Sequence, residues 1–62
     1  MKTSIDIRRD FPGTKTETRG KAGLYTCKAT RDDIGEIVGY GCTLAGAEDT
    51  AWYGVKITLR DK

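Results

Sequence analysis

The sequence lacks histidine, asparagine and glutamine altogether, and it contains a single proline and two cysteines. Without histidine the chain has no Ser-His-Asp triad, no Cys-His pair and no general acid/base of the usual kind. Two cysteines are too few for an all-cysteine zinc site, and they are not spaced as C-x-x-C. We therefore expect a protein that is not an enzyme and that holds no metal and no cofactor.

Long apolar runs are also missing from the sequence. No stretch approaches the length of about 18 apolar residues that a membrane span needs, and residues 1–6 lead into charge rather than into the apolar segment of a signal peptide. We expect no membrane contact and a cytoplasmic setting in which Cys27 and Cys42 stay reduced. Both thiols are expected to be buried as small apolar side chains.

What the chain does contain is threonine and alternating apolar residues, which favour strands. The 62 residues allow one small domain over residues 1–62, with a thin core. Residues 3–9, in which Ile5 and Ile7 alternate with polar residues, predict the first strand. Residues 24–30 and 36–42 predict an antiparallel hairpin, and for the segment 14–23 both a strand and a mobile basic loop stay open.

The register of the predicted hairpin decides which of its side chains reach the core. A four-residue loop over 32–35 places Ala29 opposite Val38 and Cys27 opposite Tyr40, and it leaves Gly39 on the other face. The apolar face of the sheet is then expected to carry one side chain from every second position of the three strands. These residues are Ile5, Ile7, Tyr25, Cys27, Ala29, Val38, Tyr40 and Cys42.

From Thr43 onward the apolar period becomes helical, with Thr43 as the expected N-cap. The apolar stripe consists of Leu44, Ala47, Ala51, Val55 and Leu59, with Trp52 at its edge, and Arg60 and Lys62 supply the charge favoured at a helix C-terminus. Residues 55–59 also alternate, so a terminal strand is the competing prediction. The fold class that follows is α+β, a three-stranded antiparallel sheet packed against one C-terminal helix, in the order βββα.

Acidic residues form two clusters, at 32–36 and at 48–49. A metal site or an acid/base pair would need a partner base or a Gly-rich phosphate loop beside them, and neither is present. We therefore expect a solvated turn for Asp32, Asp33 and Glu36. For Glu48 and Asp49 we expect the first turn of a helix, where the helix dipole favours negative charge.

Positive charge is concentrated in the first half of the chain. Residues 1–31 hold eight Lys/Arg against three Asp/Glu, whereas residues 32–62 hold three against six. Cations and hydroxyls on a sheet face that no helix covers could contact phosphates, although scattered Lys and Arg also serve solubility. We expect a small nucleic-acid-binding module whose phosphate contacts are Arg8, Arg9, Lys15, Arg19, Lys21 and Lys28. No aromatic residue other than Phe11 is expected among these cations, so stacking on single strands is not indicated.

An alternative function is a protein-interaction or homodimerisation module. In the predicted helix, Tyr53 and Ile57 lie away from the main apolar stripe, and exposed aromatic and aliphatic pairs can mark an interface. Self-association would also add burial to a thin core.

Residues 24–59 resemble double-stranded-RNA-binding domains, whose last strand and helix carry the pattern G-x-G-x-S-K-K-x-A-K/E-x-x-A-A. The matching positions are Gly39, Gly41, Thr43, Ala47, Glu48 and Ala51. The resemblance implies a strand-to-helix unit at the C-terminus. The family's phosphate-binding lysines are replaced by Leu44 and Ala45, and we expect no counterpart of the family's first helix in residues 1–20.

A second, looser similarity covers residues 24–60. The βββα order is similar to the three-stranded DNA-binding domains of plant ethylene-response factors and to the arm-binding domains of tyrosine-type integrases. Those domains place the exposed face of their sheet in the major groove. Together with the missing lysines, this similarity makes DNA the expected ligand rather than double-stranded RNA.

Overall fold

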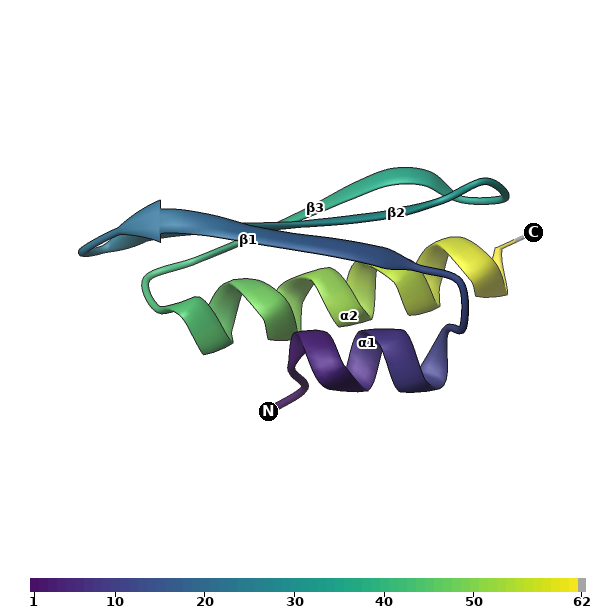
Figure 1. Ribbon diagram of the computed structural model, residues 1–62, viewed down its shortest axis with the longest axis horizontal. Coiled ribbons are helices and arrows are strands. Elements are labelled where there is room, and N and C mark those ends of the chain that lie inside the picture. The colour runs from purple at the N-terminus through teal and green to yellow at the C-terminus, as the bar shows by residue number, and fades with distance from the viewer. Residues whose placement is uncertain (62) are drawn as a thin grey trace.

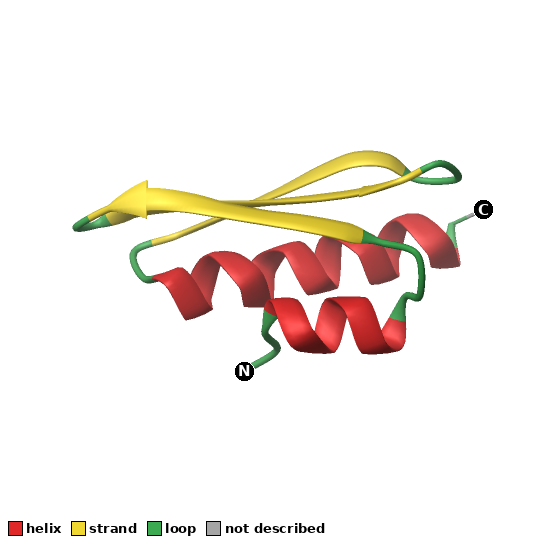
Figure 2. Cartoon of the chain, viewed as in Figure 1, coloured by secondary structure: helices red, strands yellow, loops and turns green. Residues whose placement is uncertain are grey.

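The computed structural model describes residues 1–61; Lys62, one of the two cations expected at the end of the helix, lies outside the described residues. The three strands form one antiparallel sheet in the order β1-β2-β3, and both helices lie against the same face of it (Figures 1 and 2). The antiparallel sheet followed by a C-terminal helix confirms the predicted α+β class. In chain order the elements are α1 (Ser4–Asp10), β1 (Lys15–Lys21), β2 (Leu24–Arg31), β3 (Gly35–Gly41) and α2 (Leu44–Arg60).

The N-terminal segment is a helix, so the prediction of a strand over residues 3–9 is wrong. Thr3 and Asp6 form a capping box, in which the backbone N–H of each donates to the side chain of the other, at 2.8 Å and 3.4 Å. This pair satisfies N–H groups that a helix start leaves without partners. In the helix Ile7 is buried, whereas Ile5 is 65% exposed. The expectation that no helix precedes the sheet is wrong for the same reason.

The segment 14–23, for which two structures stayed open, contains strand β1 and a tight turn. β1 pairs with β2 from Lys15 opposite Thr30 to Lys21 opposite Leu24. The two residues between the strands include Gly23, whose φ of +85° is a conformation that glycine adopts without strain. The sheet therefore takes its first strand from this segment.

The register of β2 and β3 differs by one residue from the predicted register. Arg31 pairs with Gly35, so the loop has three residues, and Lys28 lies opposite Val38 and Thr26 opposite Tyr40. A slip of one residue moves every side chain of a strand to the other face. Val38 and Tyr40 therefore point away from the helices, and the prediction that they face the core is wrong.

The slip brings the two glycines of β3 beneath helix α2. A Cβ added at Gly39 would lie 2.5 Å from the carbonyl oxygen of Ala47, and a Cβ added at Gly41 would lie 2.6 Å from the Ala47 nitrogen. Small residues on both sides thus let the helix backbone approach the strand closely. The buried core comprises Ile7, Cys27, Ala29, Ala47, Ala51, Trp52 and Val55.

Helix α2 begins as the sequence predicts. The hydroxyl of Thr43 accepts a hydrogen bond from the Gly46 N–H at 3.0 Å, which confirms Thr43 as the N-cap. The helix continues to Arg60, so the competing prediction of a terminal strand is wrong. Of the predicted apolar stripe, Leu44 is half-exposed, and of the two thiols Cys27 is buried but Cys42 is exposed, against expectation.

Glu48 joins three elements of the fold. The residue is only 7% exposed, and its carboxylate accepts from the Ser4 N–H of α1 at 3.0 Å and from the Thr18 hydroxyl of β1 at 2.8 Å. A charged group is rarely buried in this way unless its acceptors are used. Burial and the nearby Glu48 charge together raise the pKa of the Cys27 thiol, with burial the larger cause. Glu48 is thus a structural anchor. The first turn of α2 contains no acidic residue, so the prediction that Glu48 and Asp49 lie in it is wrong.

Candidate nucleic-acid interface

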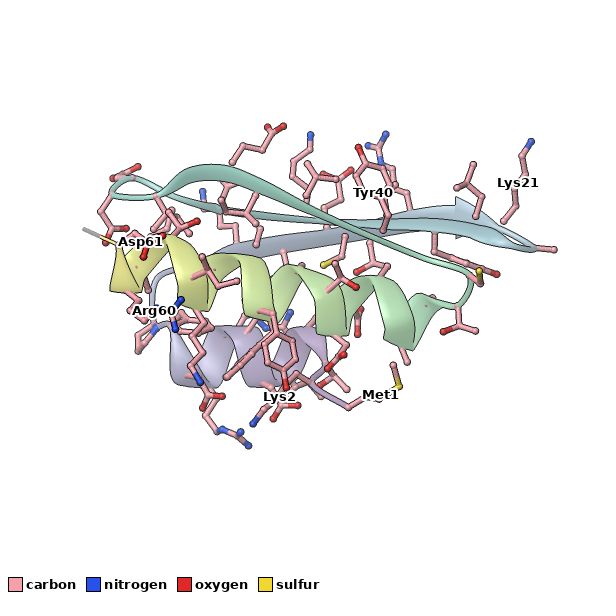
Figure 3. All side chains as sticks on the ribbon, turned by 180° about the vertical axis from the view of Figure 1, so that it is seen from behind. Met1, Lys2, Lys21, Tyr40, Arg60 and Asp61 are labelled. Atoms are coloured by element: carbon pink, nitrogen blue, oxygen red, sulfur yellow. The ribbon has the colours of Figure 1, made fainter. Side chains whose placement is uncertain are left out.

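The face of the sheet that points away from the helices presents alternate residues of every strand. The register and the pattern of burial place them in rows across the sheet. Figure 3 shows Lys21 and Tyr40 extending from this side, while Met1 and Lys2 lie on the side of the helices. We call this surface the open face; it comprises Lys15, Glu17, Arg19, Lys21, Leu24, Thr26, Lys28, Thr30, Glu36, Val38 and Tyr40.

Four of the six predicted phosphate-contact residues come together on the open face. Lys15, Arg19 and Lys21 occupy alternate positions of β1, and Lys28 stands on the neighbouring strand. Residues two apart along a strand are separated by about 6.6 Å, so Arg19 and Lys21 are neighbours on this face, whereas Glu17 stands between Lys15 and Arg19. The flanking hydroxyls of Thr26 and Thr30 on β2 belong to the same face.

The other two predicted residues lie elsewhere, in the last turn of α1. The guanidinium of Arg8 donates to the Thr16 hydroxyl at 2.7 Å. Arg9 forms ion pairs with Asp6 at 2.7 Å and with Asp10 at 3.1 Å. The structure therefore does not place Arg8 on the open face, where the predicted strand would have put it.

The charges of the open face are only partly compensated. Arg19 pairs with Glu17, and the Lys28 ammonium lies 3.8 Å from the Glu36 carboxylate. All four of these side chains are largely in water, where such pairs contribute little. Within residues 1–61, Lys15 and Lys21 form no ion pair. The face thus carries four cations against two carboxylates.

A shallow hollow lies between the first two strands on this face. It has a volume of about 380 Å³ and is lined by Lys15, Thr16, Glu17, Lys28 and Thr30. A neighbouring hollow of about 370 Å³ shares Lys15 and Thr30 and reaches Arg31. The guanidinium of Arg31 is held by the Asp33 carboxylate at 2.5 and 2.7 Å and by the Pro12 carbonyl at 3.1 Å. Arg31 therefore links the loop that contains Pro12 to the loop that contains Asp33. Its hydrogen bonds to Asp33 raise the pKa of the Arg31 guanidinium.

On the side of the helices, cations are engaged with the protein itself. The ammonium groups of Lys2 and Lys56 lie 4.7 and 5.2 Å from the centre of the Trp52 ring, a cation–π distance. The Trp52 indole N–H donates to Asp10 at 3.0 Å, and the hydrogen bonds from Arg9 and then Trp52 lower the pKa of the Asp10 carboxyl. The helices therefore offer a ligand less free positive charge than the open face does.

The predicted interaction patch lies on the outer side of α2. Tyr53 and Ile57 are 50% and 48% exposed. The Tyr53 ring stands edge-on to Trp52, with their centroids 4.9 Å apart. Tyr53 also lines a hollow of about 300 Å³ together with Met1, Lys2, Asp6 and Asp49.

No family model, curated protein or solved structure matches this chain. Neither of the two helices described in residues 1–61 is long and apolar enough to cross a membrane. The same residues contain no cluster of three or more His, Cys, Asp or Glu side chains that could hold a metal ion.

Proposed function

We propose that this protein is a small non-enzymatic module that binds nucleic acid through the open face of its sheet. The observation that carries the proposal is the grouping of Lys15, Arg19, Lys21 and Lys28 on a surface that no helix covers in the described part of the chain. Phosphate contacts of this kind supply most of the sequence-independent affinity of nucleic-acid-binding proteins. The threonine hydroxyls between the cations add neutral donors for phosphate oxygens.

The ligand we propose is DNA rather than double-stranded RNA. Helix α1 ahead of the sheet adds to the resemblance to double-stranded-RNA-binding domains. However, the start of α2 presents Leu44 and Ala45 where that family has lysines, and its first turn carries no cation. The positive charge of this chain is thus on the opposite side of the sheet from the helices. As part of the same proposal we keep a cytoplasmic setting, in which the thiols of Cys27 and Cys42 are free.

The proposal is tested by titrating fluorescently labelled DNA and following anisotropy at about 50 mM and about 200 mM salt. We expect the parent protein to bind DNA with an affinity that falls as the salt concentration rises. The double variant Lys15→Gln/Lys28→Gln should bind at least several-fold more weakly than the parent, and its affinity should depend less on salt. The matched control is Lys56→Gln with Arg60→Gln, which removes the same charge from α2 and should keep most of the affinity. Absence of binding at low salt, or equal losses in both double variants, would refute the proposal.

A second candidate function is self-association, with a second copy of this chain against the outer side of α2. It is favoured by the exposure of Tyr53 and Ile57 and by Met1, which is largely exposed and lines the same hollow as Tyr53. For so small a core, burial of this patch would add stabilisation. Sedimentation velocity at high protein concentration separates the two candidates: a dimer that Tyr53→Ser and Ile57→Ser dissociate supports self-association, and a monomer contradicts it.

A further inference from the structure

Tyr40 stands on the open face as an exposed aromatic ring among cations. It is 63% exposed and lies opposite Thr26, whose neighbour on the other side is Arg19, so that the three residues form one row across the sheet. Within residues 1–61, the Tyr40 side chain makes no ring contact and no hydrogen bond. Most of its ring is therefore available to a ligand.

The surroundings of Tyr40 suit a nucleobase with its phosphates. Val38, two residues away on the same strand, is partly exposed and extends the apolar surface beside the ring. Lys28 pairs with Val38 in the register and so lies diagonally across from Tyr40, at about 7–8 Å between Cα atoms. A long lysine side chain reaches that far. The open face therefore offers an aromatic surface on the edge strand β3, with two cations to one side of it, Lys28 on β2 and Arg19 on β1.

An aromatic ring of this kind discriminates between single strands and duplexes. In a duplex the bases are stacked on one another, so that proteins contact their edges and the phosphates, whereas an unpaired base can lay its face on an aromatic side chain. Electrostatic contacts alone would not distinguish the two forms in this way. We infer that the open face binds a single-stranded stretch of nucleic acid, with one base stacked on Tyr40 and the adjacent phosphates held by Arg19 and Lys28.

This inference rests on the proposed function, and the experiment separates the two. Labelled oligonucleotides of about 20 nucleotides, as oligo(dT), oligo(U) and a DNA duplex of the same length, are titrated at about 50 mM salt. We expect at least one single strand to bind about tenfold more tightly than the duplex. Tyr40→Ala should weaken binding of that single strand about tenfold and leave the duplex unchanged, and Tyr40→Phe should restore it. The oligo(dT) and oligo(U) arms distinguish DNA from RNA as the source of the single strand.

The matched control is Tyr53→Ala, which removes the same side chain from α2 and should leave the affinity for the single strand unchanged. A thermal melt of each variant shows whether it is folded. In the parent protein, stacking should also shift the ring protons of Tyr40 upfield when the single strand saturates it. Equal or tighter binding of the duplex, or an unchanged affinity of Tyr40→Ala for the single strand, overturns the inference while the proposed function stands. Failure of all three oligonucleotides to bind overturns both.

Discussion

The two faces of the sheet are built from the same strands but obey different constraints. On the face beneath the helices, β3 has Gly39 and Gly41, and the backbone of α2 lies so close that no side chain fits between them. On the open face, the same strand carries Glu36, Val38 and Tyr40, which meet only neighbouring strands and water. Stability is therefore concentrated on the covered face, and the open face is free to carry charge and an exposed aromatic ring. Each prediction below tests whether this division holds.

The largest effect is expected from Gly39→Val. Its Cβ would overlap the backbone of α2 at Ala47 and Ala51, and a helix backbone has no rotamer that could relieve the contact. We expect a loss of about 3 kcal/mol or more, which leaves so small a domain largely unfolded at room temperature. The neighbouring substitution Val38→Thr, on the open face, should change the free energy of unfolding by less than about 0.5 kcal/mol. Urea denaturation followed by Trp52 fluorescence measures both, and similar midpoints for the two variants would contradict the division.

A smaller effect is expected in helix α1, where two isoleucines differ in burial. Ile7→Ala should cost about 2–3 kcal/mol because it leaves a cavity in the core. Ile5→Ala should stay within about 0.5 kcal/mol because Ile5 points to solvent. If residues 3–9 were the strand that their alternation suggests, both side chains would face the core and the two variants would be equally destabilised. Thermal melts of the pair decide between these structures.

Glu48 provides a graded test of the polar contacts on the covered side. Glu48→Ala removes the acceptor of both the Ser4 N–H and the Thr18 hydroxyl, and we expect a loss of about 1–2 kcal/mol. Glu48→Gln keeps one carbonyl oxygen as an acceptor and should lose less. Chemical denaturation of the two variants checks this order. Equal stability of both variants and the parent protein would show that these hydrogen bonds contribute nothing.

The smallest effect is expected on the stability of the protein in acid. The groups responsible are the carboxyls of Asp6 and Asp10 in α1, on the covered side of the sheet. The Thr3 N–H above all lowers the pKa of the Asp6 carboxyl from its ordinary value of 3.8, and hydrogen bonds from Arg9 and Trp52 lower that of Asp10. Because both carboxyls have a lower pKa in the folded protein than in the unfolded chain, their ionised forms stabilise the fold. This stabilisation is complete above the pKa of the unfolded chain and is lost as the pH falls through the pKa of the folded protein. The melting temperature should therefore stay level down to about pH 5 and fall below about pH 4. Asp6→Asn combined with Asp10→Asn should flatten this fall, and a variant with the slope of the parent would contradict the assignment.

Much of the covered side could be predicted from the sequence because local rules determine it. The alternation in β2, the N-cap Thr43 and the spacing of Ala47, Ala51 and Val55 predict the hairpin and α2. The register could not be predicted, because a loop of three residues and one of four residues fit the same stretch around Asp32. A signal was nevertheless present: glycines at 39 and 41 share one face of a strand, as expected where a helix backbone approaches closely.

The N-terminal helix and the buried carboxylate were missed for different reasons. Thr3 and Asp6 have the spacing of a capping box, and this pattern deserves more weight than two alternating isoleucines. The partners of Glu48 lie 44 and 30 positions away in the chain, so no local pattern could indicate its burial. For the candidate interface, the shared face of the β1 cations could be predicted once their segment is taken as a strand. The face on which Tyr40 lies could not, because it depends on the register of β2 and β3.

The order of strands in the sheet also has a consequence for how the chain folds. Each strand pairs with its neighbour in sequence, so both hairpins can form on the microsecond scale without closing a long loop. The hydrogen bond from Ser4 to Glu48 instead joins residues 44 positions apart, and it can form only when α1 and α2 have come together. Contacts that form after the transition state affect unfolding more than folding. Glu48→Ala should therefore unfold faster than the parent protein, while its folding rate stays nearly the same.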